Sequence, residues 1–168
     1  MKIMFPEYSK KHGFTLVEMT MTLVIVGVLA AVSLPKFFDR STFDERYFHD
    51  DLISATRYAQ RLSTGSGCTV RLTVSGAGFS LNQDSNCDLS SPSYTLSVNR
   101  PSDSEAFSNT DVPTGLGITA SHTAYYFLPQ GGVIDSGGSN VGNATIVLNG
   151  VLTRTINIAG ATGYAYSS

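Results

Sequence analysis

An apolar run of 21 residues, Phe14 to Leu34, constrains this chain more than any other feature, and its single formal charge is Glu18. At about 1.5 Å per residue, a helix of that length is about 31 Å long and matches the roughly 30 Å hydrocarbon core of a bilayer. A carboxylate near the start of such a segment is costly, so its presence asks for a specific function. We therefore expect residues 14–34 to form one membrane-spanning helix in which Glu18 has a role of its own.

Residues 1–13 form a polar leader in front of this run. Against the single acid Glu7, the leader carries Lys2, Lys10, Lys11 and His12. This charge favours a cytoplasmic position for the leader and places the chain beyond Leu34 on the other side of the membrane. Two other interpretations of residues 1–34 stay open: a secretory signal peptide cleaved within 28–33, and an ordinary bitopic membrane anchor. The first usually has a shorter apolar core, and the second gives no reason for Glu18.

Pro35 closes the apolar run. A proline inside a helix removes one backbone hydrogen bond and crowds the residue four places earlier, here Ala31, so we expect a kink or a local opening. A helix that simply stops at the membrane interface is the alternative.

Residues 35–63 return to helical periodicity and predict an amphipathic helix that continues from the first one into a globular head. Its apolar stripe consists of Phe48, Leu52, Ala55, Ala59 and Leu62. The charged residues mostly fall away from the stripe and are expected in solvent: Arg46, Asp50, Asp51, Arg57 and Arg61. The Ser/Gly-rich segment 63–67 is a stop signal. Together, residues 14 to about 63 would form one long helix.

Residues 64–168 have the composition of a head built from short strands and turns. A hairpin is expected from 69–74 and 79–83, and a second one around Asn149-Gly150, a pair that suits a tight turn. The other expected strands are 94–98, 124–128, 144–148, 151–158 and 164–166. Residues 99–121 read as a long loop, and 131–142 as a surface loop. A head of about 105 residues can bury one small core of its own.

Cys68 and Cys87 are the only cysteines in the chain. Folding the first hairpin about Gly76-Ala77 brings residues near 68 opposite residues near 86, within bonding reach. A compartment outside the cytoplasm permits oxidation, so we favour a disulfide over two free thiols. Two cysteines without a nearby histidine do not make a zinc site, and no metal is expected.

Nothing in the sequence assembles a catalytic centre. Residues 14–168 contain eight basic and twelve acidic residues and have a formal charge of −4, which argues against nucleic acid as a partner. His49 and His122 are expected to face solvent, and no nucleotide or hydrolase motif predicts a cofactor or an activity. Tyr125, Tyr126 and Phe127 alternate faces along a strand, which favours core packing plus one surface tyrosine over a platform for stacking sugars.

The residues Gly13-Phe14-Thr15-Leu16-Val17-Glu18 resemble the class III signal of type IV prepilins and type II secretion pseudopilins. The resemblance implies cleavage between Gly13 and Phe14 by the prepilin peptidase, N-methylation of Phe14, and pairing of the Glu18 carboxylate with the terminal amine of a neighbouring subunit. It also implies that the helix can bend at Pro35. The fold class it implies is α+β and pilin-like, a long amino-terminal helix packed on a mainly antiparallel β head.

Segments 48–61 and 126–132 of the head are similar to H-type minor pseudopilins and, within that group, to the C-type minor pilins of mannose-sensitive haemagglutinin (MSHA) pili. This implies a non-enzymatic minor pilin that helps to initiate or cap a filament. Two alternatives are kept: an H-type secretion pseudopilin, and a pilus-tip subunit that binds a ligand as an adhesin or DNA receptor.

The same resemblance implies where the chain resides and which proteins it meets. We expect a single-pass protein of the bacterial inner membrane with its head in the periplasm, which later enters a pilus or pseudopilus. Its partners would be the prepilin peptidase, the inner-membrane assembly platform, and major and minor pilin subunits bound through the amino-terminal helix.

Processing at Gly13 provides the first test of this interpretation. We expect a bulky residue in place of Gly13 to block cleavage, whereas Gly13→Ala is partly tolerated because it adds only one methyl group. Intact-mass analysis of protein extracted from membranes measures the outcome. A mature chain that begins at any residue other than Phe14 would contradict the resemblance.

Overall fold

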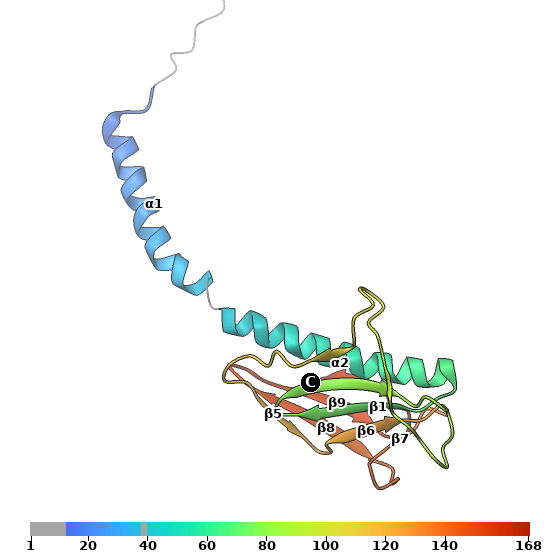
Figure 1. Cartoon of the computed structure of the whole chain (residues 1–168). Coiled ribbons are helices and arrows are strands. Elements are labelled where there is room, and N and C mark those ends of the chain that lie inside the picture. The colour runs from blue at the N-terminus through green and yellow to red at the C-terminus, as the bar shows by residue number, and fades with distance from the viewer. Residues whose placement is uncertain (1–12, 38–39) are drawn as a thin grey trace, which may run out of the picture. The chain divides into compact units, whose positions relative to one another are not determined.

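The computed structural model describes residues 13–37 and 40–168 (Figure 1). These residues belong to two compact units that divide between residues 39 and 40. The first unit contains α1, Leu16–Phe37, and the second contains α2, Arg40–Ser66, together with the strands. The predicted leader falls almost entirely on residues 1–12, which lie outside the described residues. So do residues 38–39, through which one continuous helix was predicted to pass.

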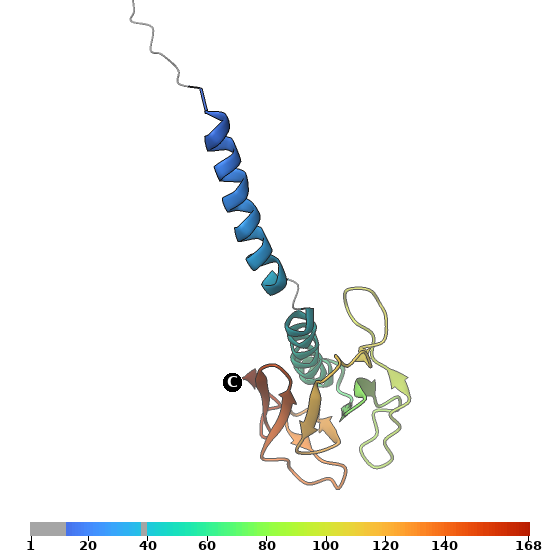
Figure 2. The ribbon, with the colours of Figure 1, turned by 90° about the vertical axis from the view of Figure 1, so that its left-hand side faces the viewer.

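Two antiparallel sheets form the head, and Figure 2 shows the late strands, in orange to red, on the side opposite the green early strands. The first sheet has the order β3-β2-β1-β6-β7, with β4 pairing with β2, and the second has the order β10-β9-β8-β5. The strands are β1 Val70–Ser75, β2 Gly78–Gln83, β3 Leu96–Ser97, β4 Ser108–Asn109, β5 Gly117–Ala120, β6 Ala124–Phe127, β7 Val133–Ile134, β8 Asn143–Asn149, β9 Thr153–Ala159 and β10 Ala165–Ser167.

Helix α2 presents its apolar stripe to both sheets, as its periodicity predicted. Its inner members Phe48, Leu52, Ala55 and Ala59 are buried, and Leu62 packs partly buried against the core. The helix contacts β1, β2 and β6 of the first sheet and β10 of the second. The core of the head therefore forms where one helix face meets the inner faces of both sheets.

The end of α2 lies three residues beyond the predicted position. Gly67 adopts a φ of 73°, and its amide donates to the carbonyl of Ser63 at 3.0 Å. A glycine in the left-handed region is a common way to end a helix, because it satisfies a free carbonyl without a Cβ clash. The predicted stop signal is thus used at its last residue.

The first predicted hairpin is present, and its turn is Gly76-Ala77, because Ser75 pairs with Gly78 and Val70 with Gln83. Burial along β1 alternates in step with the pleat, so every second side chain enters the core. This hairpin is the centre of the first sheet.

Two of the predicted loops contain strands, so these predictions were wrong. Residues 99–121 include β4, which pairs with β2, and β5, which pairs with β8. Residues 131–142 begin with β7, which pairs with β6. These strands have two to four residues, too few to show an alternating pattern, and they form because a longer strand offers them a free edge.

The second hairpin was predicted with a tight turn at Asn149-Gly150, but Asn149 pairs with Thr153, so the loop holds three residues. The predicted strand 151–158 therefore begins later, at Thr153. Both carboxylate oxygens of Glu45 accept a hydrogen bond from the amide of Val151, at 3.0 and 2.9 Å. Gly150 lies directly against that carboxylate, which would have to shift to make room for a Cβ. Helix α2 therefore sets the shape of this turn.

Asp51 was predicted in solvent and is buried instead. Its carboxylate accepts two hydrogen bonds from Arg100, at 2.5 and 2.8 Å, and one from the Asn109 amide at 2.9 Å. The bond to Asp51 raises the pKa of Arg100 above its ordinary value. The guanidinium also stacks over Phe107, 4.6 Å from the ring centroid. The pair holds the segment between β3 and β4 against α2.

Removing one member of this pair leaves the other without its ionic partner in a part-buried site. We expect Asp51→Ala to lower the free energy of unfolding by about 3 kcal/mol, because an uncompensated buried charge is strongly destabilising. Asp44→Ala, at an exposed acid of the same helix, should change it by at most about 0.5 kcal/mol.

Denaturant unfolding of the full chain in detergent measures both variants. The double variant Asp51→Met with Arg100→Met should recover most of the loss, because it removes both charges together. Equal stability of Asp51→Ala and Asp44→Ala would contradict this account of the pair.

Candidate functional site

Helix α1 begins directly behind the predicted cleavage point. Gly13 to Thr15 precede the helix, and the Thr15 hydroxyl accepts a hydrogen bond from the amide of Glu18 at 3.2 Å. Thr15 is therefore the N-cap, and Glu18 stands three positions later, where an acid also suits the positive end of the helix dipole. Because a hydroxyl already caps the helix, starting it does not require the Glu18 carboxylate.

The other polar side chains of residues 13–31 have their hydrogen bonds inside the helix. The hydroxyls of Thr20 and Thr22 donate to the carbonyls of Val17 and Met19, each at 2.9 Å. The structure gives the Glu18 carboxylate no hydrogen bond within these residues. Residues 13–31 therefore offer one charged group without a hydrogen bond, the Glu18 carboxylate, on a mostly apolar surface.

Most of the apolar side chains of α1 and of Phe14 are open to their surroundings. Phe14, Leu16, Val17, Met19, Met21, Leu23, Val24, Ile25, Val26, Val28 and Leu29 are all at least 54% exposed. A helix that is apolar all round needs apolar surroundings. None of the helices in the ranges 13–37 and 40–168 combines the length and the apolarity that crossing a bilayer requires. The predicted single membrane span therefore stays a prediction.

Pro35 lies within α1, which continues to Phe37. The structure describes no side chains from residue 32 to residue 40, so the bend at Pro35 stays a prediction. Cleavage after Gly13 and methylation of Phe14 are enzymatic modifications of the chain, and both stay predictions.

Cys68 and Cys87 form the expected disulfide, with a Cα–Cα distance of 4.6 Å. The amide of Asp84 donates to the carbonyl of Thr69 at 2.9 Å, which extends the β1–β2 ladder by one pair toward the disulfide. The bond therefore closes the open end of the hairpin, as the folding argument predicted.

Only Leu96–Ser97 of the predicted strand 94–98 pairs as a strand, with β2. Tyr94 lies outside this strand and makes other contacts. Tyr94 packs against Tyr126 with centroids 5.1 Å apart, and the Arg71 guanidinium lies 5.0 Å from the Tyr94 ring. Burial raises the pKa of Tyr94, and the neighbouring Asp84 carboxylate raises it further. Tyr125 and Phe127 are buried and Tyr126 is half-buried, so the predicted alternation along β6 is confirmed.

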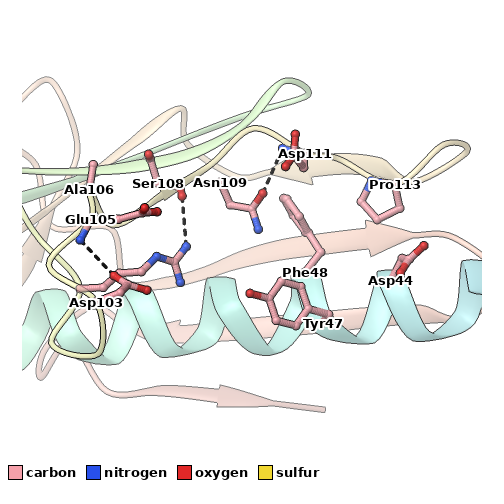
Figure 3. A pocket seen from close by; sticks show the side chains of 11 residues that line it. Asp44, Tyr47, Phe48, Asp103, Glu105, Ala106, Ser108, Asn109, Asp111 and Pro113 are labelled. Carbon is pink, nitrogen blue, oxygen red and sulfur yellow. Dashed lines mark hydrogen bonds between the residues drawn. The ribbon is translucent and has the colours of Figure 1, made fainter.

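A cavity of about 440 Å³ lies between α2 and the segment 100–113 (Figure 3). Asp44 and Tyr47 on the helix face Asn109, Asp111 and Pro113 on the opposite segment (Figure 3). The side-chain oxygens of Asp103 and Asn109 accept hydrogen bonds from the amides two residues later, each at 3.0 Å. These bonds shape the loop, and Arg100 is already bound to Asp51. Nothing among the lining residues pairs a nucleophile with a base.

His49 was expected to face solvent, but its side chain is buried. One ring nitrogen lies 3.0 Å from Asp50 Oδ1 and the other 3.0 Å from Ser167 Oγ. This is the bonding order of a Ser-His-Asp triad, but the Asp50 side chain is 76% exposed, whereas the acid of such a triad is buried. The contact therefore serves to join α2 to β10. His122 is half-buried beside the Tyr125 ring, with centroids 5.8 Å apart.

Across the described residues, no group of three or more His, Cys, Asp or Glu side chains is arranged to hold a metal ion. Sequence reasoning missed Glu45 and Arg100 as structural residues, because their partners are distant in sequence. No local signal marks either of them.

Two comparisons with known proteins concern sequence similarity. Residues 8–34, which include Gly13, Phe14 and Glu18, match the family model for the prokaryotic N-terminal methylation motif. Over 55 residues the chain is 33% identical to the type IV narrow pilus major component PilA5 of Thermus thermophilus, a match covering 33% of this chain and 47% of that protein. The chain thus spans about half the length of the curated relative it matches.

A third comparison concerns the fold. The crystal structure of the type IV minor pilin FimU of Pseudomonas aeruginosa superimposes with a TM-score of 0.52 at 13% sequence identity, covering 73% of this chain and 91% of that one. The chain has a pilin-like fold behind an N-terminal methylation motif. Its predicted fold class, a pilin-like helix and antiparallel sheet head, is confirmed. Pilins are structural subunits rather than enzymes, and this pilin-like chain carries their fold and their methylation motif.

The disulfide of this pilin-like protein can be tested directly. In the chain-entropy model, a bond across 19 residues stabilises the fold by about 3 kcal/mol, so its loss should lower the melting temperature by about 10 °C. The measurement compares thermal melts of the full chain in detergent with and without reductant.

A double variant, Cys68→Ala with Cys87→Ala, is the matched control. It should melt near the reduced protein and should not respond to reductant. A reduced protein that melts at the same temperature as the oxidised one would contradict the stabilising role.

Proposed function

We propose that this chain is a non-enzymatic minor subunit of a type IV pilus of the MSHA type, and that it helps to initiate or cap the filament. The observation that carries the proposal is the Glu18 carboxylate, which has no hydrogen bond among the described residues and stands on an exposed, mostly apolar helix behind an N-terminal methylation motif. A pilin-like head on the same chain supports it.

Assembly through α1 explains both unusual properties of that helix. Apolar side chains around its whole circumference gain by packing against the same helix of neighbouring subunits, since burial removes them from water. The Glu18 carboxylate then needs a cationic partner in that apolar setting. The amine of a cleaved and methylated Phe14 on the adjacent subunit is such a partner.

Before assembly, the same helix would hold the subunit in the bacterial inner membrane by a single pass, with the head in the periplasm. The basic leader favours this orientation, and the Cys68–Cys87 disulfide fits an oxidising compartment. In this proposal the prepilin peptidase cleaves after Gly13, and the assembly platform then delivers the subunit to the filament.

The MSHA assignment rests on two segments of the head. Residues 48–61 lie in α2, and residues 126–132 begin in β6. An H-type pseudopilin of a type II secretion system is the alternative, and the genes beside this one distinguish the two systems. We assign the chain a minor rather than a major role in the pilus because its head has features of its own.

Glu18→Gln tests the proposal because it keeps the size of the side chain and removes its charge. We expect normal insertion, cleavage and head folding, but poor incorporation into filaments, because the pairing with the neighbouring amine is lost. If the subunit initiates assembly, the number of surface pili should fall to the level of the deletion strain. Pilus counts by electron microscopy, beside immunoblots of mature protein in the membrane, measure this.

Thr22→Val is the matched control, since it removes a polar group from α1 whose hydrogen bond lies within the helix. It should assemble normally. Normal piliation of the deletion strain would contradict the initiating role, and normal piliation of Glu18→Gln alone would show that the carboxylate is not needed.

A further inference from the structure

The outward face of the second sheet carries no charge. The side chains on this face alternate along β8 and β9 with the buried side chains of the core. The pairing of the strands places them in rows across the sheet. One row runs from Tyr166 through Asn157 to Thr145, and another from Thr155 through Val147 to Thr119. The residues of this face are Thr119, Ser121, Asn143, Thr145, Val147, Asn149, Thr153, Thr155, Asn157, Ala159, Tyr164, Tyr166 and Ser168.

Hydroxyl and amide groups dominate this uncharged face, and the charged side chains of the head lie elsewhere. Arg57 donates to the carbonyl of Ala165 from the helix side of β10, and Glu45 and Asp51 are buried residues of α2 itself. Charged residues are among those found most often on the solvent-exposed surface of a protein. A sheet face without them is therefore an unusual surface.

Two tyrosines border this face along β10. Tyr164 is 56% exposed and Tyr166 is 45% exposed, and their rings are nearly parallel, with centroids 6.1 Å apart. Between them, Ala165 is completely buried and anchors the strand in the core. The Ala165 carbonyl is further held by Arg57. The tyrosine pair is therefore presented outward from a fixed backbone.

The chemistry of this face selects among classes of ligand. Nucleic acid and anionic lipid need clustered cations, and the face has none. Protein interfaces are built around a cluster of apolar, aromatic and arginine anchors, whereas the aliphatic side chains of this face are only Val147 and the small Ala159. A neutral sugar chain has hydroxyl groups that match Thr and Asn side chains, and apolar C–H faces that pack on exposed aromatic rings.

We propose that the outward face of the second sheet, with Tyr164 and Tyr166 as its aromatic anchors, binds a neutral polysaccharide in extended form. An extended chain fits because the polar rows cross three or four strands. This binding is a further activity beside filament assembly, and it does not depend on Glu18. It assigns a position in the head to the ligand-binding alternative that the sequence left open.

The test measures binding of the full chain, in detergent micelles, to defined oligosaccharides by isothermal titration calorimetry. The neutral probes are cellohexaose, chitohexaose and β-1,4-mannohexaose, and the anionic probe is hexagalacturonate. We expect at least one neutral probe to bind, and the anionic probe to bind more weakly because the face offers it no cation. The double variant Tyr164→Ala with Tyr166→Ala should weaken neutral binding by about tenfold or more.

Two control variants separate stacking from other effects. Tyr164→Phe with Tyr166→Phe keeps both rings and should retain most of the affinity, which also shows that the face is intact. Tyr47→Ala removes another exposed tyrosine, on α2, and should leave binding unchanged.

Three results would overturn the proposal. They are no binding of any neutral probe at millimolar concentration, binding that is indifferent to the tyrosine pair, and self-association of the head that the Ala double variant abolishes. The last would assign the face to contacts between subunits. None of these results affects the Glu18 experiment, so the two proposals fail separately.

Discussion

The packing of one face of α2 against two sheets is the interaction on which the rest of the head depends. Phe48, Leu52 and Ala55 are buried in it, and the helix contacts β1, β2, β6 and β10. Without the helix, one apolar side of the first sheet would be uncovered. Strand β10 would also lose the contacts that hold it to α2. Small residues at 55 and 59 let the helix approach the strands closely.

Polar groups on the flanks of the same helix fix how the chain runs around this core. Glu45 binds the turn between β8 and β9, Asp51 binds Arg100, and His49 binds Ser167. Each contact joins residues more than forty positions apart in sequence. Buried polar groups require partners, so these contacts also select one arrangement of loops among those the apolar core alone would permit.

The division of the chain into two compact units corresponds to a division of its proposed tasks. Residues 13–31 have a mostly apolar surface and one carboxylate, that of Glu18, without a hydrogen bond among the described residues, a combination suited to joining identical helices. The head closes its own core and leaves different surfaces available, among them the uncharged face with Tyr164 and Tyr166. Attachment to a filament and binding of a ligand can therefore change independently.

Sequence alone determined the features whose physical causes are local. The apolar run with Glu18, the stripe on α2, the alternation at 125–127 and the hairpin that brings Cys68 near Cys87 all follow from short-range periodicity. Two aromatic residues at positions 164 and 166 of a predicted strand also had to share one face. Together with the resemblance of residues 13–18 to a class III signal, these features predicted a pilin-like fold before any contact was known.

Only the tertiary structure decided the features whose causes are distant partners. The short strands β4, β5 and β7 exist because longer strands offer them an edge, and no pattern in two to four residues reveals that. Asp51 and His49 read as solvent-facing because a charged side chain carries no sign of the residue that will neutralise or bond it. The sequence shows that a polar side chain requires a hydrogen-bonding or ionic partner if it is buried. Only the fold determines which distant residue is that partner.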